Sequence, residues 1–147
     1  MNLKRVLLIS LILIALAASL TVVSADKAIK IDGVNFNIPD GFEENKSSSV
    51  DGIELTYANE YDAKGYGKLF SDGNDEIIIM ILEPESVSAD DLNEFDVSRG
   101  CTSKTINGIE GLYSGDGEDF SFSFIEDGKY CVITASNEGL FESVVPK

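Results

Sequence analysis

The sequence predicts an α+β domain in which two short helices pack on an antiparallel β-sheet of hairpins. One observation is that Asx-Gly pairs, which favour tight hairpin turns, recur between runs that alternate apolar with polar residues. The pairs are Asp32-Gly33, Asp40-Gly41, Asp51-Gly52, Asp72-Gly73, Asn107-Gly108, Asp116-Gly117 and Asp127-Gly128. The other observation is a change to a helical period in two places, after Ser88 and after Ser136. We therefore expect two helices and about nine strands.

The first half of the domain is predicted to consist of strands. Residues 29–31 and 34–38 alternate around the first turn, and Pro39 ends the second strand because proline cannot donate a ladder hydrogen bond. The next strands are expected at residues 53–57, 65–71 and 76–82. Residues 77–82 are apolar without alternation, so we expect this strand to be central and covered on both faces.

A short helix is predicted after Ser88. Ser88 and Asp91 have the spacing of a capping box, and an acidic first turn suits the helix dipole. Ala89, Leu92 and Phe95 then share one helical face, which we expect to contact the sheet.

The chain then returns to strands, expected at residues 102–106, 109–114, 120–125 and 130–135. In the third of these, Phe120, Phe122 and Phe124 are predicted to face the core, while Ser121 and Ser123 face away from it. Ser136 is predicted to cap a last helix at residues 137–144. That helix covers the sheet with its apolar side chains, which are Leu140, Phe141, Val144 and Val145.

Residues 1–25 are predicted to be a signal peptide. Lys4 and Arg5 precede an uncharged aliphatic run at residues 6–23, and small side chains before Ala25 suit cleavage after that residue. The alternative is an uncleaved N-terminal anchor, because 18 apolar residues lie at the lower edge of what spans a bilayer. In both cases residues 26–147 form a single acidic domain on the extracytoplasmic side, either secreted or membrane-anchored.

The charge of the domain limits its partners. The chain has 11 basic and 26 acidic residues, and residues 1–25 contain two of the basic ones, so residues 26–147 carry a formal net charge of −17. This field repels nucleic acid and anionic lipid, so we expect no nucleic acid partner and membrane contact only through residues 6–23. It attracts cations or a basic partner, although a solvated surface suited to salt or crowding is the simpler interpretation.

The composition gives little support to catalysis. The sequence has no His, and thus lacks the commonest general base and metal ligand, and it has no Gly-x-Ser-x-Gly elbow. We assign no residue a catalytic or cofactor-binding role. Carboxylates are abundant, so a small hydrolase with an acid pair stays as an alternative.

Two acidic turns are candidates for a calcium site. Asp72, Asn74 and Glu76 lie in one turn, and Asp116 and Glu118 lie in another. Their oxygen donors suit Ca²⁺, but neither turn has the Asp-x-Asp-x-Asp-Gly spacing of a known calcium loop. Ordinary solvated hairpin turns are the competing interpretation.

The two cysteines leave two alternatives open. An even count in an exported protein favours a disulfide between Cys101 and Cys131. In a simple meander, however, the two residues would lie three strand spacings, or roughly 14 Å, apart. A disulfide needs Cα atoms within about 7 Å of each other, so a bridge would require Cys101 to fold back over the sheet.

Asn45 is a candidate for N-glycosylation. Asn45-Lys46-Ser47 is a sequon in a segment predicted to be exported. It lies in the polar stretch 43–49, which we expect to be exposed.

Tyr57, Tyr61, Tyr66 and Phe70 surround the glycines of strand 65–71. One interpretation is an aromatic binding surface. The other places Tyr57 and Phe70 in the core and leaves Tyr61 and Tyr66 partly exposed.

Three stretches carry a resemblance to known proteins. They are Phe36-Asn-Ile-Pro-Asp-Gly-Phe42, Thr105-Ile-Asn-Gly-Ile-Glu-Gly-Leu-Tyr-Ser114 and Asp127-Gly-Lys-Tyr-Cys-Val-Ile-Thr-Ala-Ser136. With the leader, they resemble small exported proteins of unknown function from methanogenic archaea, over most of residues 28–145. The first stretch and the strand order are also similar, more loosely, to the PsbP-like sandwich. The resemblance implies a sheet flanked by helices and no catalytic residue.

The sequence as a whole predicts an exported, non-enzymatic binding module that interacts with an unknown protein or ligand of the cell envelope. A carboxylate-dependent hydrolase and a structural surface protein are the alternatives. A deep pocket with two carboxylates about 5–9 Å apart would favour the hydrolase. A shallow acidic surface with an exposed apolar patch would favour the binding module.

Overall fold

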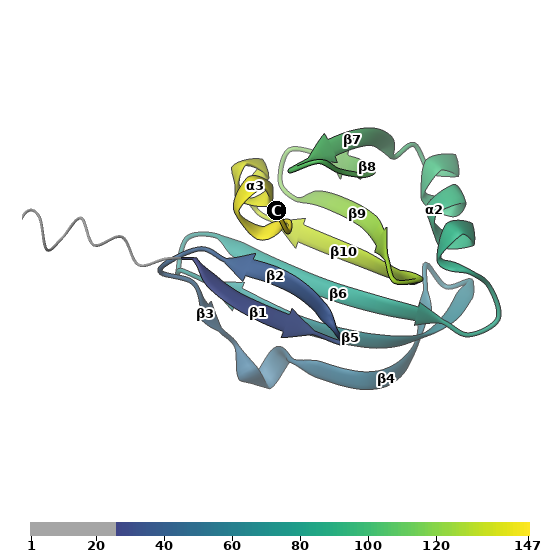
Figure 1. The fold of residues 1–147 in the computed structure, drawn as a ribbon, viewed down its shortest axis with the longest axis horizontal. Coiled ribbons are helices and arrows are strands. Elements are labelled where there is room, and N and C mark those ends of the chain that lie inside the picture. Colours follow the sequence, from purple (N-terminus) through teal and green to yellow (C-terminus); the bar gives the residue numbers. More distant parts are fainter. Residues whose placement is uncertain (1–25) are drawn as a thin grey trace, which may run out of the picture.

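The computed structural model describes residues 26–147, which form an eight-stranded antiparallel β-sheet with a two-stranded hairpin lying on one of its faces (Figure 1). The hairpin consists of β1 (Lys27–Ile31) and β2 (Val34–Ile38). The sheet strands are β3 (Glu43–Glu44), β4 (Val50–Tyr57), β5 (Tyr61–Ser71), β6 (Glu76–Pro84), β7 (Thr102–Ile106), β8 (Ile109–Gly115), β9 (Phe120–Glu126) and β10 (Lys129–Ala135). Their order is β3-β5-β6-β10-β9-β8-β7, and β4 pairs with β5 beside β3. The predicted class, an antiparallel sheet with two short helices, is confirmed.

The predicted signal peptide, and the alternative anchor at residues 6–23, lie outside the described residues. Within residues 26–147, no helix has both the length and the apolar character needed to cross a membrane.

Four strands in the first half, β1, β4, β5 and β6, are longer than the sequence pattern predicts. β4 begins at Val50 because Asp51-Gly52 is not the hairpin turn that we expected. The register shifts between Asp51 and Ile53, so the pair forms a β-bulge inside the strand, with Gly52 at a φ of +64°. The hairpin turn of β4 and β5 falls instead at Ala58 and Asn59, which both have positive φ.

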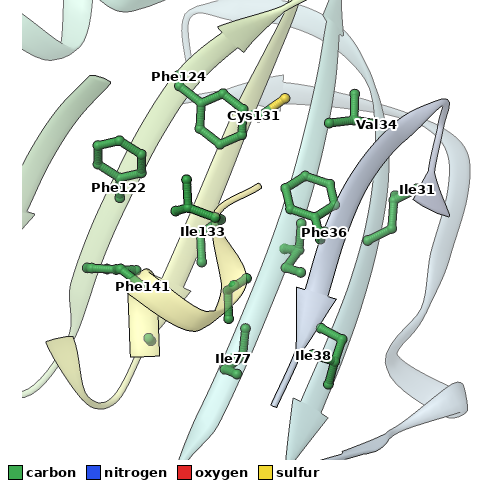
Figure 2. Close-up of a cluster of buried hydrophobic side chains, with 14 of the residues drawn as sticks. Ile31, Val34, Phe36, Ile38, Ile77, Phe122, Phe124, Cys131, Ile133 and Phe141 are labelled. Carbon is green, nitrogen blue, oxygen red and sulfur yellow. The ribbon is translucent and has the colours of Figure 1, made fainter. Parts of the chain in front are cut away.

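One face of the sheet is covered by the β1–β2 hairpin and by the C-terminal helix. Figure 2 shows the resulting apolar core, in which Phe36 of the hairpin lies beside Phe124 of β9. The buried side chains of this core are Ile31, Val34, Phe36, Ile38, Phe70, Ile77, Ile79, Ile81, Ile106, Phe122, Phe124, Cys131, Ile133, Ala135, Phe141, Val144 and Val145. Lys129 ties the hairpin turn to the sheet through an ion pair of 2.8 Å with Asp32.

The opposite face is covered at one end only, by helix α2 (Ala89–Ser98) (Figure 1). The predicted capping box is present: the Ser88 hydroxyl accepts the Asp91 N–H at 3.3 Å, and the Asp91 carboxylate accepts the Ser88 N–H at 2.7 Å. Ala89 and Leu92 are buried against Leu82 of β6, as the predicted helical face requires.

The prediction that β6 is covered on both faces is wrong at its first half. β6 does lie centrally, between β5 and β10, and Ile77, Ile79 and Ile81 are fully buried. Ile78 points to the opposite face, where α2 does not reach, and 38% of its surface is exposed.

The end of the chain forms a short 3₁₀ turn, η2 (Glu138–Leu140), followed by helix α3 (Phe141–Val144). The predicted cap at Ser136 is wrong, because the Asn137 side chain accepts the Gly139 N–H at 2.9 Å and caps the turn. The Ser136 hydroxyl instead accepts the Glu76 N–H and donates to Asp75, both across the sheet. Strand pairing therefore takes the serine away from its local capping role.

We expect alanine substitutions at two strand glycines, Gly111 and Gly65, to lower the free energy of unfolding by different amounts. A Cβ on Gly111 would overlap the backbone oxygen of Ser123 and the ring of Phe122, because β8 passes tightly over β9 there. A Cβ on Gly65 would overlap the end of the Leu55 side chain and otherwise make ordinary contact with the sulfur of Met80. We expect Gly111→Ala to lower the free energy of unfolding by about 1–3 kcal/mol, and Gly65→Ala to lower it by less, because a side chain can move aside. Urea unfolding of both variants measures this, and equal losses would contradict it.

Candidate functional site

The Asp96 carboxylate occupies a position where both burial and the helix dipole disfavour its charge. It lies in the last turn of α2 and is only 6% exposed. Burial disfavours a charge, and the C-terminal end of a helix is the negative end of its dipole, which repels a carboxylate. The groups around Asp96 therefore have to compensate for both costs.

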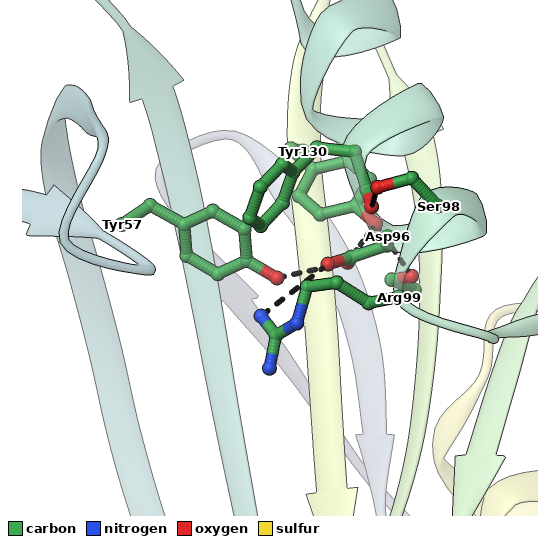
Figure 3. Close-up of polar contacts among 7 residues, drawn as sticks. Tyr57, Asp96, Ser98, Arg99 and Tyr130 are labelled. Carbon is green, nitrogen blue, oxygen red and sulfur yellow. Dashed lines mark hydrogen bonds and ion pairs between the residues drawn. The ribbon is translucent and has the colours of Figure 1, made fainter.

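Two tyrosine hydroxyls and one guanidinium surround this carboxylate (Figure 3). Its Oδ2 accepts hydrogen bonds from Tyr57 at 2.8 Å and from Tyr130 at 2.6 Å. Its Oδ1 lies 3.9 Å from Nη1 of Arg99. Tyr57 belongs to β4 and Tyr130 to β10, so the carboxylate joins α2 to two strands that β5 and β6 separate.

Ser123 extends this network from the neighbouring strand β9. Its Oγ lies 2.8 Å from the Tyr130 hydroxyl, and since Tyr130 donates its proton to Asp96, Ser123 donates to Tyr130. Ser123 faces away from the core that contains Phe122 and Phe124, as predicted, but it is buried on the side of the sheet that α2 covers, which the sequence did not predict. Phe122 and Phe124 do face the core on the opposite side, as predicted, and Phe120 is partly buried there.

The environment of the two phenols favours their protonated form. Burial raises the pKa of Tyr57, and the hydrogen bond to the negative Asp96 raises it further. The pKa of Tyr130 is raised by the same two causes in the same order. Both hydroxyls therefore stay hydrogen-bond donors to Asp96 across the physiological pH range.

A cavity of about 150 Å³ opens beside Asp96. Its lining combines one carboxylate, one guanidinium, one thiol and three serine hydroxyls with a few apolar groups. The lining residues are Tyr57, Asp96, Arg99, Cys101, Leu112, Ser114, Ser121, Ser123 and Val132. This donor and acceptor set suits a small polar ligand.

Beyond the cavity, the same side of the sheet carries a surface that we call the open face. It consists of Ile53, Leu55, Leu69, Ile78, Met80, Val132 and Thr134. Directly paired residues share a face, and Ile78 is paired with both Leu69 and Thr134. Ile53 and Ile78 are 42% and 38% exposed, and none of these seven side chains is charged.

The five calcium candidates lie in two turns at one end of the sheet, since Ile77 and Phe120 both pair beside Ala135. In the β5–β6 turn, which also contains Asn74 and Glu76, Asp72 Oδ1 accepts two backbone N–H groups at 2.8 and 2.7 Å. In the β8–β9 turn, Asp116 Oδ1 accepts the N–H of Glu118 at 3.1 Å and that of Asp119 at 3.2 Å.

These backbone hydrogen bonds lower the pKa of Asp72 and Asp116. Across residues 26–147, no three His, Cys, Asp or Glu side chains come together as a metal-binding group. The two aspartates thus each hold the backbone of their own turn.

The two cysteines lie on opposite faces and both thiols are free. Cys101 precedes β7 and is partly exposed at the cavity, whereas Cys131 of β10 is buried in the core. The strand order places β7 three strands from β10. Burial raises the pKa of Cys131 to about 12, so this thiol behaves as a core side chain.

Asn45 is exposed and precedes a short 3₁₀ turn, η1 (Lys46–Ser48). Its side-chain oxygen accepts hydrogen bonds from the Ser47 hydroxyl at 2.6 Å and from the Ser47 N–H at 3.2 Å. The two sequon residues are therefore in direct contact on the surface.

A second cavity, of about 540 Å³, contains two carboxylates, Glu138 and Glu142. It lies between β7 and the C-terminal helix. The hydrogen bond from Lys104 lowers the pKa of Glu138, which is the wrong direction for a general acid.

The Asp96 cluster was not predicted, although the sequence contains a signal for it. Asp96 follows Leu92 by four residues and Ala89 by seven, so helical spacing places it on the buried face of α2. An acidic residue on an apolar face requires partners. One of the two interpretations of Tyr57 placed it in the core, where it is partly buried, but neither anticipated the group that its hydroxyl meets.

Fold and site together define an antiparallel sheet domain in which one face is half covered and holds a buried carboxylate, Asp96, beneath its helix. No protein-family model matches the chain, and no curated protein or solved structure is significantly similar to it. The functional argument therefore rests on the geometry of the chain.

The raised pKa values of Tyr57 and Tyr130 predict a loss of stability at alkaline pH. The ordinary pKa is 10.0, so above pH 10 the unfolded chain releases protons that the folded protein keeps. Their contribution is complete below pH 10 and is lost as the pH rises toward the folded-state values. We expect the free energy of unfolding to fall above pH 10. We also expect two of the five tyrosines to ionise last in a tyrosinate absorbance titration.

Asp96→Asn should move these two ionisations to lower pH, because the negative acceptor of both hydroxyls is removed. Asp90→Asn, an exposed change on the same helix, is the matched control and should leave them in place. Identical titrations of wild type and Asp96→Asn would refute the assignment.

Proposed function

We propose that the protein is an exported, non-enzymatic binding module of the cell envelope whose protein partner docks on the open face. The observation that carries this proposal is the absence of charge on the open face, in a domain whose net charge is −17. Scattered exposed apolar residues are ordinary, but a contiguous patch with a polar rim is typical of interaction surfaces.

The surroundings of the open face indicate the chemistry of the partner. The two acidic turns adjoin it at one end, where Asp72, Asp75 and Glu76 precede Ile78 and where Asp116 and Asp119 precede Phe120. A partner with an apolar centre and a basic rim would bury the open face with its centre and form ion pairs with the two acidic turns through its rim. A second copy of the chain would bring two strongly acidic domains together, so a basic partner is favoured.

The other two interpretations receive less support. The hydrolase requires a carboxylic acid that is protonated near neutral pH, and the pKa of Glu138 is lowered. A purely structural surface protein gives no reason to keep Ile53 and Ile78 exposed beside an acidic rim. Export itself is supported by the pattern of residues 1–25 in the sequence.

Site-specific photo-crosslinking tests the docking surface. A photoreactive amino acid is placed at position 78, in the open face, or at position 97 as a matched control, because Val97 is 51% exposed on α2. We expect position 78 to crosslink one basic protein in the native cells, with a yield that falls as salt rises, and position 97 to give no such product. Equal products from both positions, no product from position 78, or a crosslink to a second copy would each overturn this docking mode.

The intact mass of the protein from its native cells tests export. A mass that begins at Asp26 is expected if the leader is cleaved. A mass that retains residues 1–25 would identify the anchored alternative if the protein is found in the membrane, and would argue against export if it is found in the cytoplasm. Added mass that disappears in Asn45→Gln would identify the glycan.

A further inference from the structure

One oxygen of the buried Asp96 carboxylate is left without a hydrogen bond. Both tyrosine hydroxyls donate to Oδ2, no donor of the described residues forms a hydrogen bond with Oδ1, and Nη1 of Arg99 lies 3.9 Å from it, beyond hydrogen-bond distance. Asp96 lines the 150 Å³ cavity, and Oδ1 is not sealed from solvent. A buried carboxylate with a free acceptor at a cavity can take a donor from a ligand.

The guanidinium of Arg99 also has hydrogen-bonding capacity to spare. Its side chain is 56% exposed, it makes no ion pair shorter than 3.9 Å among the described residues, and it lies over the Phe95 ring at 5.5 Å. A guanidinium has five N–H donors in a planar fork that suits a carboxylate. The cavity therefore presents an acceptor without a hydrogen bond, Asp96 Oδ1, beside the guanidinium of Arg99, whose N–H groups can donate to a ligand.

We infer that this cavity binds a small zwitterionic α-amino acid. The ligand's ammonium group donates to Asp96 Oδ1, and its carboxylate accepts from the Arg99 guanidinium. An α-amino acid carries its two charges on adjacent carbons, which matches two opposite protein charges that lie near each other without being hydrogen-bonded. A simple anion would face the Asp96 charge, and a simple cation would face the Arg99 charge.

The rest of the lining suits the same ligand. An ammonium group has three donors, and after Asp96 accepts one, the hydroxyl oxygens of Ser114 and Ser121 supply further acceptors. A volume of about 150 Å³ holds about five waters, which is the space of a ligand with roughly five to seven heavy atoms. Glycine, alanine and serine have this size.

Isothermal titration calorimetry of the full chain tests the inference with L-alanine and its two single-charge analogues. Ethylamine lacks the carboxylate, and propionate lacks the ammonium group. We expect saturable binding of alanine, binding at least about tenfold weaker for either analogue, and weaker binding of the bulky tryptophan. Absence of alanine binding, or an analogue that binds as tightly as alanine, would overturn the inference.

Two variants place the ligand in this cavity. Arg99→Gln, at an exposed position, should weaken alanine binding by about tenfold or more while leaving ethylamine binding unchanged. Lys64→Gln is the matched control, because it removes an exposed positive charge on β5 and should change nothing. Asp96→Asn should abolish binding of alanine and ethylamine alike, and if it does not fold, Arg99→Gln still decides. Equal effects of Arg99→Gln and Lys64→Gln would overturn the site. The result is independent of docking on the open face, which has its own test.

Discussion

The structure depends on how the buried charge of Asp96 is satisfied. A largely buried carboxylate at a helix C-terminus is stable only if its donors are present and correctly placed. Tyr57 and Tyr130 supply two of them from strands on opposite sides of β5 and β6. Loss of either hydroxyl would leave the carboxylate short of a donor, so the end of α2 is fixed at one position over the sheet. That position decides which part of this face is covered.

How much of each face of the sheet is covered then follows from the length of the segments that pack on it. The β1–β2 hairpin and α3 cover one face, and this face contains most of the buried apolar side chains. The other face has a single ten-residue helix, which cannot extend over the full width of seven neighbouring strands. Pinned at the end that contains Tyr130, α2 leaves Ile78 and its neighbours in solvent. The open face is thus a direct consequence of where the helix is held.

Much of this fold could be predicted from the sequence because its signals are local. Alternation identified the strands, and Asx-Gly pairs marked three hairpin turns in which Asp32, Asn107 and Asp127 adopt positive φ. The capping box fixed the start of α2. The inference that failed for a polar side chain concerned one with a distant partner. Ser136 bonds across the sheet and not to its own turn.

The candidate site was missed for the same reason. Asp96 meets hydroxyls that are 39 and 34 residues away in the sequence. Periodicity reports which residues share a face, but it does not report which strands lie beneath a helix or which of their side chains carry donors there. Only the strand order, which places β4 and β10 on either side of β5 and β6, brings these three residues together.

The two proposed recognition surfaces on this side of the sheet would rely on different electrostatics. The net charge of −17 acts at long range and concentrates basic partners near the open face, but salt screens it beyond about 8 Å at physiological ionic strength. A zwitterion has no net charge and gains little from that field, so its capture depends on short-range contacts with Asp96 and Arg99, which salt screens less. Salt therefore separates the two surfaces: it weakens docking on the open face much more than it weakens binding in the cavity.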